Sequence, residues 1–196
     1  MNKELIQIIK KLSVQFGIEA AALASFIMTE TGGKGFDEKT GKILIQFEPK
    51  WFKKHVPYAP SGKWSVNKIE KQQVEWVAFS DAFRNNADGA MKSTSIGLGQ
   101  IMGFHYKILG FKTVGEMWDH AKKSLENQVW QICKFIETDK ELKKAIVAKN
   151  WHVIASIYNG SGYLELARKI GREPYNITME RNYKKLKPLF VNDQLS

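Results

Sequence analysis

The chain has 196 residues, of which 43% are hydrophobic and 26% are charged. This composition is typical of a globular protein with a packed core and excludes an intrinsically disordered chain. Lysine and arginine number 30 against 20 aspartates and glutamates, a formal charge of +10. Such a surplus favours polyanionic partners, namely nucleic acid, anionic lipid headgroups or an acidic cell-wall polymer, without choosing among them.

The sequence also limits where the protein is made. Residues 1–12 carry charges throughout and lack an apolar run followed by a small-residue cleavage site, so we expect no signal peptide. No stretch approaches the length of a membrane span, so we expect no stable membrane insertion. There is no nucleic-acid-binding motif, and we expect no nucleic-acid partner. We therefore expect synthesis in the cytoplasm, so that any work outside it needs another route out.

Two helices are predicted at the start of the chain. Apolar residues recur at helical spacing over residues 5–12, and this helix ends by Gly17. The second helix covers residues 18–30. Glu30 lies on its apolar face, at a position where an apolar residue is expected. The other members of that face are Leu23, Phe26 and Ile27.

Glu30 is the main anomaly of the sequence. Glycines at positions 32, 33 and 35 predict that the helix stops there, which leaves Glu30 in the last turn facing a surface cleft. The helix C-terminus and the apolar face both favour the neutral carboxyl and should raise its pKa. A carboxyl group that stays protonated near neutral pH is a general acid. The alternative is that Glu30 reaches solvent or pairs with a lysine.

A polar turn at residues 37–42 leads into a predicted strand at residues 43–49, where apolar residues alternate and Pro49 ends the run. One face of this strand carries Glu48. Two carboxyls on adjacent elements would suit glycoside hydrolysis, which requires a carboxyl on each side of the scissile bond. The alternative is that Glu48 forms a salt bridge to a nearby lysine, Lys50 or Lys53, or anchors the turn.

Residues 51–64 contain prolines and glycines that predict irregular structure. Its aromatic residues either line a sugar-binding groove or pack in the core, and both readings stay open. Residues 67–86 have helical spacing, and residues 87–94 predict a further short helical turn. The groove candidates are Trp51, Tyr58 and Trp64, and the helical positions are Ile69, Val74, Val77 and Ala78.

Residues 95–103, SIGLGQIMG, predict a loop or hairpin. Its glycines allow a ligand to approach the main chain, and the amide of Gln100 both donates and accepts hydrogen bonds. No phosphate-binding glycine pattern follows, so a nucleotide site is not expected.

The remainder of the chain is predicted to be helical. Cys133 lies on an apolar stripe, which favours a buried structural thiol over a nucleophile. Tyr158 ends another stripe, so its hydroxyl should project from the edge of the core. The predicted helices are 114–121 with Thr113 as cap, 124–138 with Ser124 as cap, 139–148, 151–158, and one or two helices within 164–196 that break at Pro174 and Pro188 and end in a polar tail.

Three stretches occur in a recognisable order: TETGG at residues 29–33, SIGLGQIMG at 95–103 and IYNGSGY at 157–163. Together they resemble the signatures of the lysozyme-like superfamily, which includes goose-type lysozymes and soluble lytic transglycosylases. GFDEKTGKILIQFEPKWF with GLGQIMGFHYKILG is more closely similar to the N-acetylmuramidase domain of bacteriophage endolysins. The resemblance covers residues 14–190. The sequence departs from the family pattern at Thr31, where many relatives have serine, and at Ile96, which occupies a position that is often aromatic in the endolysin family.

The resemblance implies an α+β, predominantly α, lysozyme-like fold with a small β-hairpin beside a helical core. It implies a single domain over residues 1–196 without a separate wall-binding module. The implied reaction is cleavage of the β-1,4 bond between N-acetylmuramic acid and N-acetylglucosamine, with Glu30 as general acid, Glu48 as the second carboxylate, and neither metal nor cofactor. The implied substrate-binding residues are Thr31, Ser95, Gln100, Ile101, Met102, Tyr158, which would hydrogen-bond near Glu30, and Asn159.

Two other functions remain open. If Glu48 is structural, the substrate's acetamido group could replace it, and a lytic transglycosylase would leave anhydro ends. A non-catalytic wall-binding protein could also keep the fold. For an enzyme, we expect a monomer that acts on peptidoglycan strands at the bacterial cell wall. It would reach the wall through a phage holin or on lysis, and its positive charge would help to hold it there.

Overall fold

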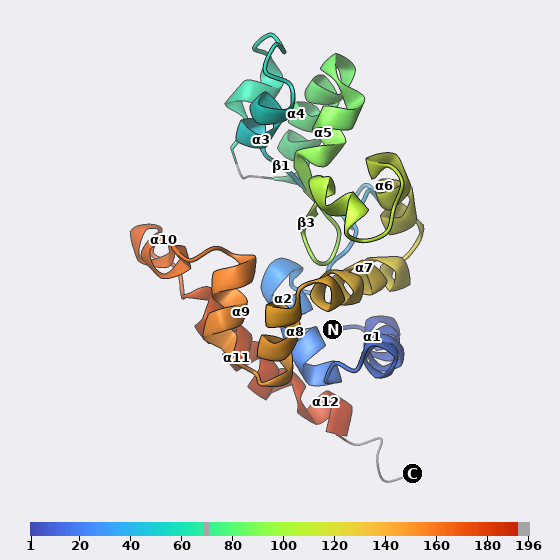
Figure 1. Ribbon diagram of the computed structural model, residues 1–196, viewed down its shortest axis with the longest axis vertical. Helices are drawn as coiled ribbons and strands as arrows, with labels where there is room; N and C mark the ends of the chain where they lie inside the picture. Colours follow the sequence, from blue (N-terminus) through green and yellow to red (C-terminus); the bar gives the residue numbers. More distant parts are fainter. Residues whose placement is uncertain (69–70, 192–196) are drawn as a thin grey trace. The chain divides into compact units, whose positions relative to one another are not determined.

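The computed structural model describes residues 1–68 and 71–191, and its backbone contacts divide the chain into two compact units. Unit 1 comprises Met1–Gly33 and Ile132–Ser196, and unit 2 comprises Lys34–Gln131. Figure 1 labels their α-helices and the strands β1 and β3. The single-domain organisation stays a prediction.

Unit 1 is helical, and α2 is its central helix. Every residue from Ala21 to Ile27 is buried, and α2 packs against α1, α11 and α12. A helix that is apolar on all sides needs such cover on all sides. The unit contains α1 (Lys3–Phe16), α2 (Ala20–Thr31), the second half of α7 (Leu125–Thr138), α8 (Lys140–Val147), α9 (Trp151–Tyr158), α10 (Tyr163–Lys169), α11 (Tyr175–Leu186) and α12 (Pro188–Val191).

The first two helices have the predicted bounds within a few residues, and Gly17 ends α1 in a left-handed conformation with φ 64°. The end of the chain forms three helices rather than the one or two predicted. Pro174 directly precedes α11 and Pro188 begins α12, because a proline is tolerated where a helix starts. The predicted polar tail, residues 192–196, lies outside the described residues.

Unit 2 combines short helices with a small sheet. It contains β1 (Ile45–Phe47), α3 (Pro49–His55), the 3-10 helix η1 (Lys63–Val66), α4 (Gln72–Asn85), α5 (Ala87–Lys92), β2 (Thr94–Ile96), β3 (Ile101–Met102), the 3-10 helix η2 (Gly103–Lys107), α6 (Val114–Lys123) and the first half of α7. The helix-rich content with this sheet confirms the predicted α+β fold class. Ser124 caps α7 as predicted, since its hydroxyl accepts from the Asn127 N–H at 3.1 Å.

The sheet is antiparallel, in the order β1-β2-β3. Gln46 lies opposite Ser95, and Ser95 lies opposite Met102. The hairpin predicted at residues 95–103 is therefore confirmed as β2 and β3. The outer edge of β1 is covered by side chains of α4. Gln72 accepts from the N–H of Ile45 at 2.9 Å and donates to its carbonyl at 2.8 Å, as a neighbouring strand would.

Two predictions for unit 2 were wrong. The irregular segment expected at residues 51–64 contains the helix α3 and the 3-10 helix η1. Pro49, which was expected only to end the strand, takes the first position of α3, where its fixed φ suits a helix. The strand is also shorter than residues 43–49, since Ile43 forms only an isolated bridge with Phe36.

The helix predicted at residues 67–86 exists as α4, but its apolar positions were misjudged. Val74 and Val77 are 38% and 47% exposed, whereas Ala78 is buried. Ile69 lies outside the described residues. The buried face of α4 is formed by Glu75, Ala78, Phe79 and Ala82.

Among the helices that the structure describes, none is both long and apolar enough to cross a membrane. The described residues also contain no cluster of three or more histidine, cysteine or acidic side chains that could hold a metal ion.

Candidate active site

Glu30 lies in the last turn of α2, as the sequence predicts. The helix ends at Thr31 because Gly32 adopts a left-handed conformation with φ 63°, and its N–H donates to the carbonyl of Met28. Glycine takes this conformation without the strain that a Cβ would add. The Glu30 side chain therefore leaves the helix where the buried part of α2 ends, and the residue is half-buried.

Burial raises the pKa of Glu30 from its ordinary value of 4.5 to about 7, because desolvation disfavours the charged carboxylate. The hydroxyl of Tyr175 donates a hydrogen bond to Oε1 of Glu30 and opposes this shift. No lysine or arginine among the described residues contributes to the pKa of Glu30. The carboxyl is thus held partly protonated near neutral pH, as a general acid requires.

Tyr175 reaches Glu30 because α11 packs along α2. Ser25 donates to the carbonyl of Met179 at 2.6 Å, and Asn182 donates to the hydroxyl of Thr29 at 3.0 Å. These two bonds join the polar side chains of α2 to α11. They fix the first turn of α11, which carries Tyr175, against the end of α2.

Tyr158 ends α9 close to the same carboxyl. Its ring packs edge-on against Phe26, with ring centroids 4.5 Å apart, and against Phe135 at 5.6 Å. Burial raises the pKa of Tyr158 well above its ordinary value, and the charge of Glu30 adds to the shift. The phenol therefore stays neutral beside Glu30. The structure thus brings Glu30, Tyr158 and Tyr175 together in unit 1.

The other two candidates of unit 1 have local contacts. Thr31 donates to the carbonyl of Ile27 at 3.4 Å, one turn back in α2. Asn159 is exposed and follows α9, where its N–H donates to the carbonyl of Ala155. Their role in substrate binding stays a prediction.

Glu48, in unit 2, directly follows β1 and directly precedes α3. Its Oε1 accepts a hydrogen bond from the side-chain amide of Gln46 at 2.7 Å. Burial raises the pKa of Glu48, and the charge of Glu75 adds to the rise, while Gln46 and Lys50 lower it. The alternative role, a salt bridge to Lys50 or Lys53, is not seen among the described residues, and the Lys53 ammonium group instead donates to the carbonyl of Ala59 at 3.0 Å.

The hairpin candidates lie beside β1 in the same sheet. The hydroxyl of Ser95 donates to the side-chain oxygen of Gln100 at 2.9 Å, and the amide of Gln100 donates to the carbonyl of Gly97 at 2.8 Å. Gln100 has φ 47°, a conformation that costs a residue other than glycine some strain. The hairpin therefore holds the Gln100 amide in place. In β3, Ile101 is buried and Met102 is half-buried.

Of the aromatic residues at 51–64, the structure places Trp64 in the core, while a role of Trp51 and Tyr58 in a sugar-binding groove stays a prediction. Trp64 is 4% exposed and packs against Phe52 at 4.9 Å, so it belongs to the core. Tyr58 is 97% exposed. Trp51 is half-buried, and its ring lies 4.7 Å from that of Phe104.

Cys133 is buried, as predicted, and burial raises its pKa to about 12. The thiol therefore stays protonated and is a poor nucleophile.

Sequence reasoning missed Tyr175 and Gln46. Tyr175 lies 145 positions from Glu30, and its only local signal is the preceding proline, which marks a helix start. Gln46 was visible as the polar residue that alternates with Ile45 and Phe47, two positions before Glu48. This spacing puts both side chains on one face of an extended chain and could have suggested the contact.

The crystal structure of the Burkholderia AP3 phage endolysin is similar to this chain, with a TM-score of 0.77 and 25% sequence identity over 94% of this chain and 70% of that chain. The model of the N-acetylmuramidase family matches residues 19–187, and the chain belongs to this family. The family and the structural similarity together identify the protein as a peptidoglycan hydrolase with a lysozyme-like fold. No match was found among curated proteins. The family confirms the resemblance seen in the sequence and makes peptidoglycan the substrate.

Proposed function

We propose that this protein is an endolysin-type muramidase that cleaves the β-1,4 bond between N-acetylmuramic acid and N-acetylglucosamine, with Glu30 as general acid. The observation that carries the proposal is the raised pKa of Glu30, about 7. A carboxyl group with this pKa is still protonated in a large fraction of molecules at neutral pH, and it ionises readily once it has given up its proton.

In the proposed reaction, the protonated carboxyl of Glu30 donates its hydrogen to the bridging oxygen as the bond from that oxygen to C1 of the muramic acid breaks. N-acetylglucosamine leaves with a free 4-hydroxyl, and C1 acquires oxocarbenium character. Water then adds to C1, and its proton returns to solvent or to a carboxylate. The Tyr175 hydroxyl supports this step because its hydrogen bond stabilises the ionised Glu30 that the transfer produces.

We assign the second carboxylate to Glu48, which would activate the water or stabilise the positive charge at C1. Its hydrogen bond from Gln46 at 2.7 Å holds the carboxylate in one orientation, which supports such a role. Ser95, Gln100, Ile101 and Met102 of the hairpin would position the acetamido groups of the sugars. Thr31, Tyr158 and Asn159 would contact the substrate around Glu30.

The test of the general acid is Glu30→Gln, which keeps the shape of the side chain and removes its acidic proton. We expect clearance of a peptidoglycan suspension to fall by at least a hundredfold, because general acid catalysis contributes about 10² to 10⁴ in rate. Glu19→Gln is the matched control, since it makes the same change at the residue just before α2. Unchanged clearance by the Glu30 variant would refute the assignment.

The test of Glu48 is Glu48→Gln combined with mass spectrometry of the released fragments. Hydrolysis leaves reducing ends, whereas transglycosylation leaves anhydro ends that are lighter by one water. We expect reducing ends from the wild type and a large loss of rate in the variant. Anhydro ends from the wild type would instead identify a lytic transglycosylase.

The remaining expectations concern access to the wall. We propose that the protein acts as a monomer on the glycan strands in the periplasm and reaches them through a membrane made permeable by a holin. Sedimentation of the purified protein and lysis assays with and without membrane permeabilisation test these two points separately.

A further inference from the structure

Unit 2 contains a pocket that the proposed reaction does not use. Its volume is about 680 Å³, within the range of sites that hold a small molecule or a short peptide. The pocket lies between the turn at residues 37–42, η1 and one face of α4. Five of its lining residues are basic: Lys39, Lys42, Lys63, Lys71 and Arg84.

The positive charge of this pocket is largely uncompensated. Asp37 is the only acidic residue of the described lining. One oxygen of its carboxylate, Oδ1, holds the turn, since it accepts from the N–H of Thr40 at 2.9 Å and from its hydroxyl at 2.8 Å. Within residues 1–68 and 71–191, none of the four lysines forms an ion pair. Because five basic residues and one acidic residue line the pocket, it favours a ligand with several negative charges.

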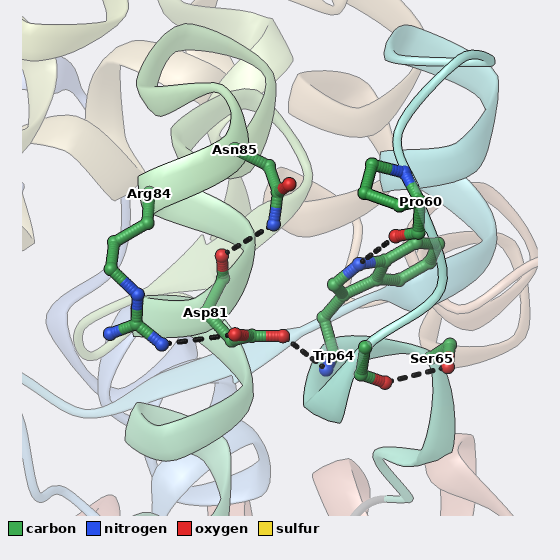
Figure 2. Close-up of polar contacts among 7 residues, drawn as sticks. Pro60, Trp64, Ser65, Asp81, Arg84 and Asn85 are labelled. Atoms are coloured by element: carbon green, nitrogen blue, oxygen red, sulfur yellow. Dashed lines mark hydrogen bonds and ion pairs between the residues drawn. The ribbon is translucent and has the colours of Figure 1, made fainter.

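The wall of the pocket is held rigidly on one side. Asp81 of α4 accepts from the guanidinium of Arg84 at 2.9 Å and from the N–H of Trp64 at 3.3 Å, as Figure 2 shows. The Trp64 indole in turn donates to the carbonyl of Pro60 at 3.0 Å. These bonds fix η1, which carries Lys63, against α4. This side of the pocket is therefore held in place without a ligand.

The same contacts bear on how the pocket can hold an anion. Arg84, the side chain best suited to bidentate binding of phosphate, already donates one guanidinium N–H to Asp81, whose negative charge disfavours a second anion beside it. The ammonium group of Lys42 lies 4.9 Å from the ring centroid of Trp76, and so covers the ring on which a nucleic-acid base would stack. Besides the lysine ammoniums, the lining offers a ligand the amide of Gln73, the hydroxyl of Ser80 and the apolar side chain of Val77. This combination suits carboxylates, peptide bonds and small aliphatic side chains.

We propose that this pocket binds a short acidic peptide, and that its natural ligand is the carboxylate-bearing stem peptide attached to the muramic acid of the substrate. The inference rests on the proposed function only for the identity of the substrate. Gln72 lines the pocket and also hydrogen-bonds both backbone groups of Ile45. The pocket is thus joined to β1, the strand that leads to Glu48, so a bound stem peptide would help to hold the glycan strand on unit 2.

The test measures binding without turnover. Isothermal titration calorimetry uses the Glu30→Gln protein and a synthetic stem pentapeptide with carboxylates on its D-glutamate, diaminopimelate and terminal D-alanine residues. We expect saturable binding that weakens as salt is added. The double substitution Lys63→Ala with Lys71→Ala should raise the Kd about tenfold at low salt, which corresponds to two partly exposed ion pairs. Lys107→Ala with Lys112→Ala removes two exposed charges elsewhere in unit 2 and should leave the Kd unchanged.

Three results would overturn the proposal: no binding of the peptide, an equal Kd for the two double variants, or tighter binding of inorganic phosphate or a single-stranded oligonucleotide with the same dependence on Lys63 and Lys71.

A second measurement compares hydrolysis of intact peptidoglycan with hydrolysis of glycan strands from which an amidase has removed the peptides. In the otherwise wild-type enzyme, the pocket variant should lose rate only on the intact substrate. Equal loss on both substrates would also contradict the proposal. Failure of the general-acid proposal appears separately, as wall clearance that survives Glu30→Gln.

Discussion

Replacement of Tyr175 by phenylalanine tests how unit 1 sets the acidity of Glu30. The change keeps the ring and removes the hydroxyl that donates to Oε1 of Glu30. This hydrogen bond lowers the pKa of Glu30, while burial raises it to about 7. A hydrogen bond to a charged group contributes roughly 1.5–3 kcal/mol, or about one to two pKa units. We therefore expect the pKa of Glu30 in the variant to rise to about 8 or 9.

The sign of the effect on activity follows from the role of Glu30. A general acid works when protonated, so the wild-type rate should fall as the pH rises through about 7. In Tyr175→Phe, this fall should move upward by about one to two pH units. The rate at pH 5.5 should be lower than in the wild type, because an acid with a higher pKa gives up its proton less readily. The ratio of the rate at pH 8.5 to the rate at pH 5.5 should nevertheless rise.

The assay is the initial rate of wall clearance between pH 5 and pH 9.5. Tyr183→Phe is the matched control, since it removes a hydroxyl from the same helix that donates to Glu19 at 2.7 Å. The control should keep the wild-type pH profile. A profile of Tyr175→Phe that does not move, or that moves to lower pH, would refute the reasoning. A rate that rises with pH through 7 in the wild type would instead mean that Glu30 works as a base.

Three further predictions concern stability and reactivity. The folded pKa of Glu30, about 7, lies above its ordinary value of 4.5, so the stability that this group contributes is full below pH 4.5 and is lost as the pH rises through 7. Glu30→Gln should therefore stabilise the fold by about 3 kcal/mol at pH 8 and hardly at all at pH 4.5. Urea unfolding at the two pH values measures this difference. Gly103→Ala should destabilise the fold by roughly 3 kcal/mol or more, because the new Cβ would lie 2.0 Å from the backbone oxygen of Met91. The control Gly115→Ala lies in α6, where the new Cβ would meet only the hydroxyl oxygen of Thr113 at 3.7 Å, an ordinary contact, so it should stabilise the fold by up to about 1 kcal/mol; equal melting temperatures for the two variants would contradict the clash at Gly103. Cys133, with a pKa of about 12, should react with an aromatic disulfide at pH 8 only when the protein is unfolded, so rapid labelling of the folded protein would show the burial to be wrong.

Local patterns in the sequence determined where the acidic residue lies on its own helix. The apolar spacing before Glu30 and the glycine at position 32 are enough to predict a carboxyl in the last turn of a buried helix, and the structure confirms it. The hairpin at residues 95–103 and the cap at Ser124 were predictable for the same reason. Each depends on interactions between residues only a few positions apart, which the sequence displays directly.

Other features became visible only with the tertiary structure. The helix α3 is one, because the prolines and glycines of residues 51–64 conceal the burial of Phe52 against Trp64. The side chain of Gln72, which takes the place of a strand beside β1, is another. The pocket also joins lysines that are more than 20 positions apart in the chain.

The acidity of Glu30 combines both kinds of information. Its position on α2 makes burial foreseeable, and burial is the larger cause of its raised pKa. The opposing hydrogen bond comes from Tyr175, 145 positions away, and exists because the bonds from Ser25 and Asn182 hold α11 against α2. The sequence by itself therefore determined which residue carries the proton. Only the packing of α11 decided by how much a hydrogen bond opposes that burial, because hydrogen bonds between distant segments depend on how the helices pack and not on local spacing.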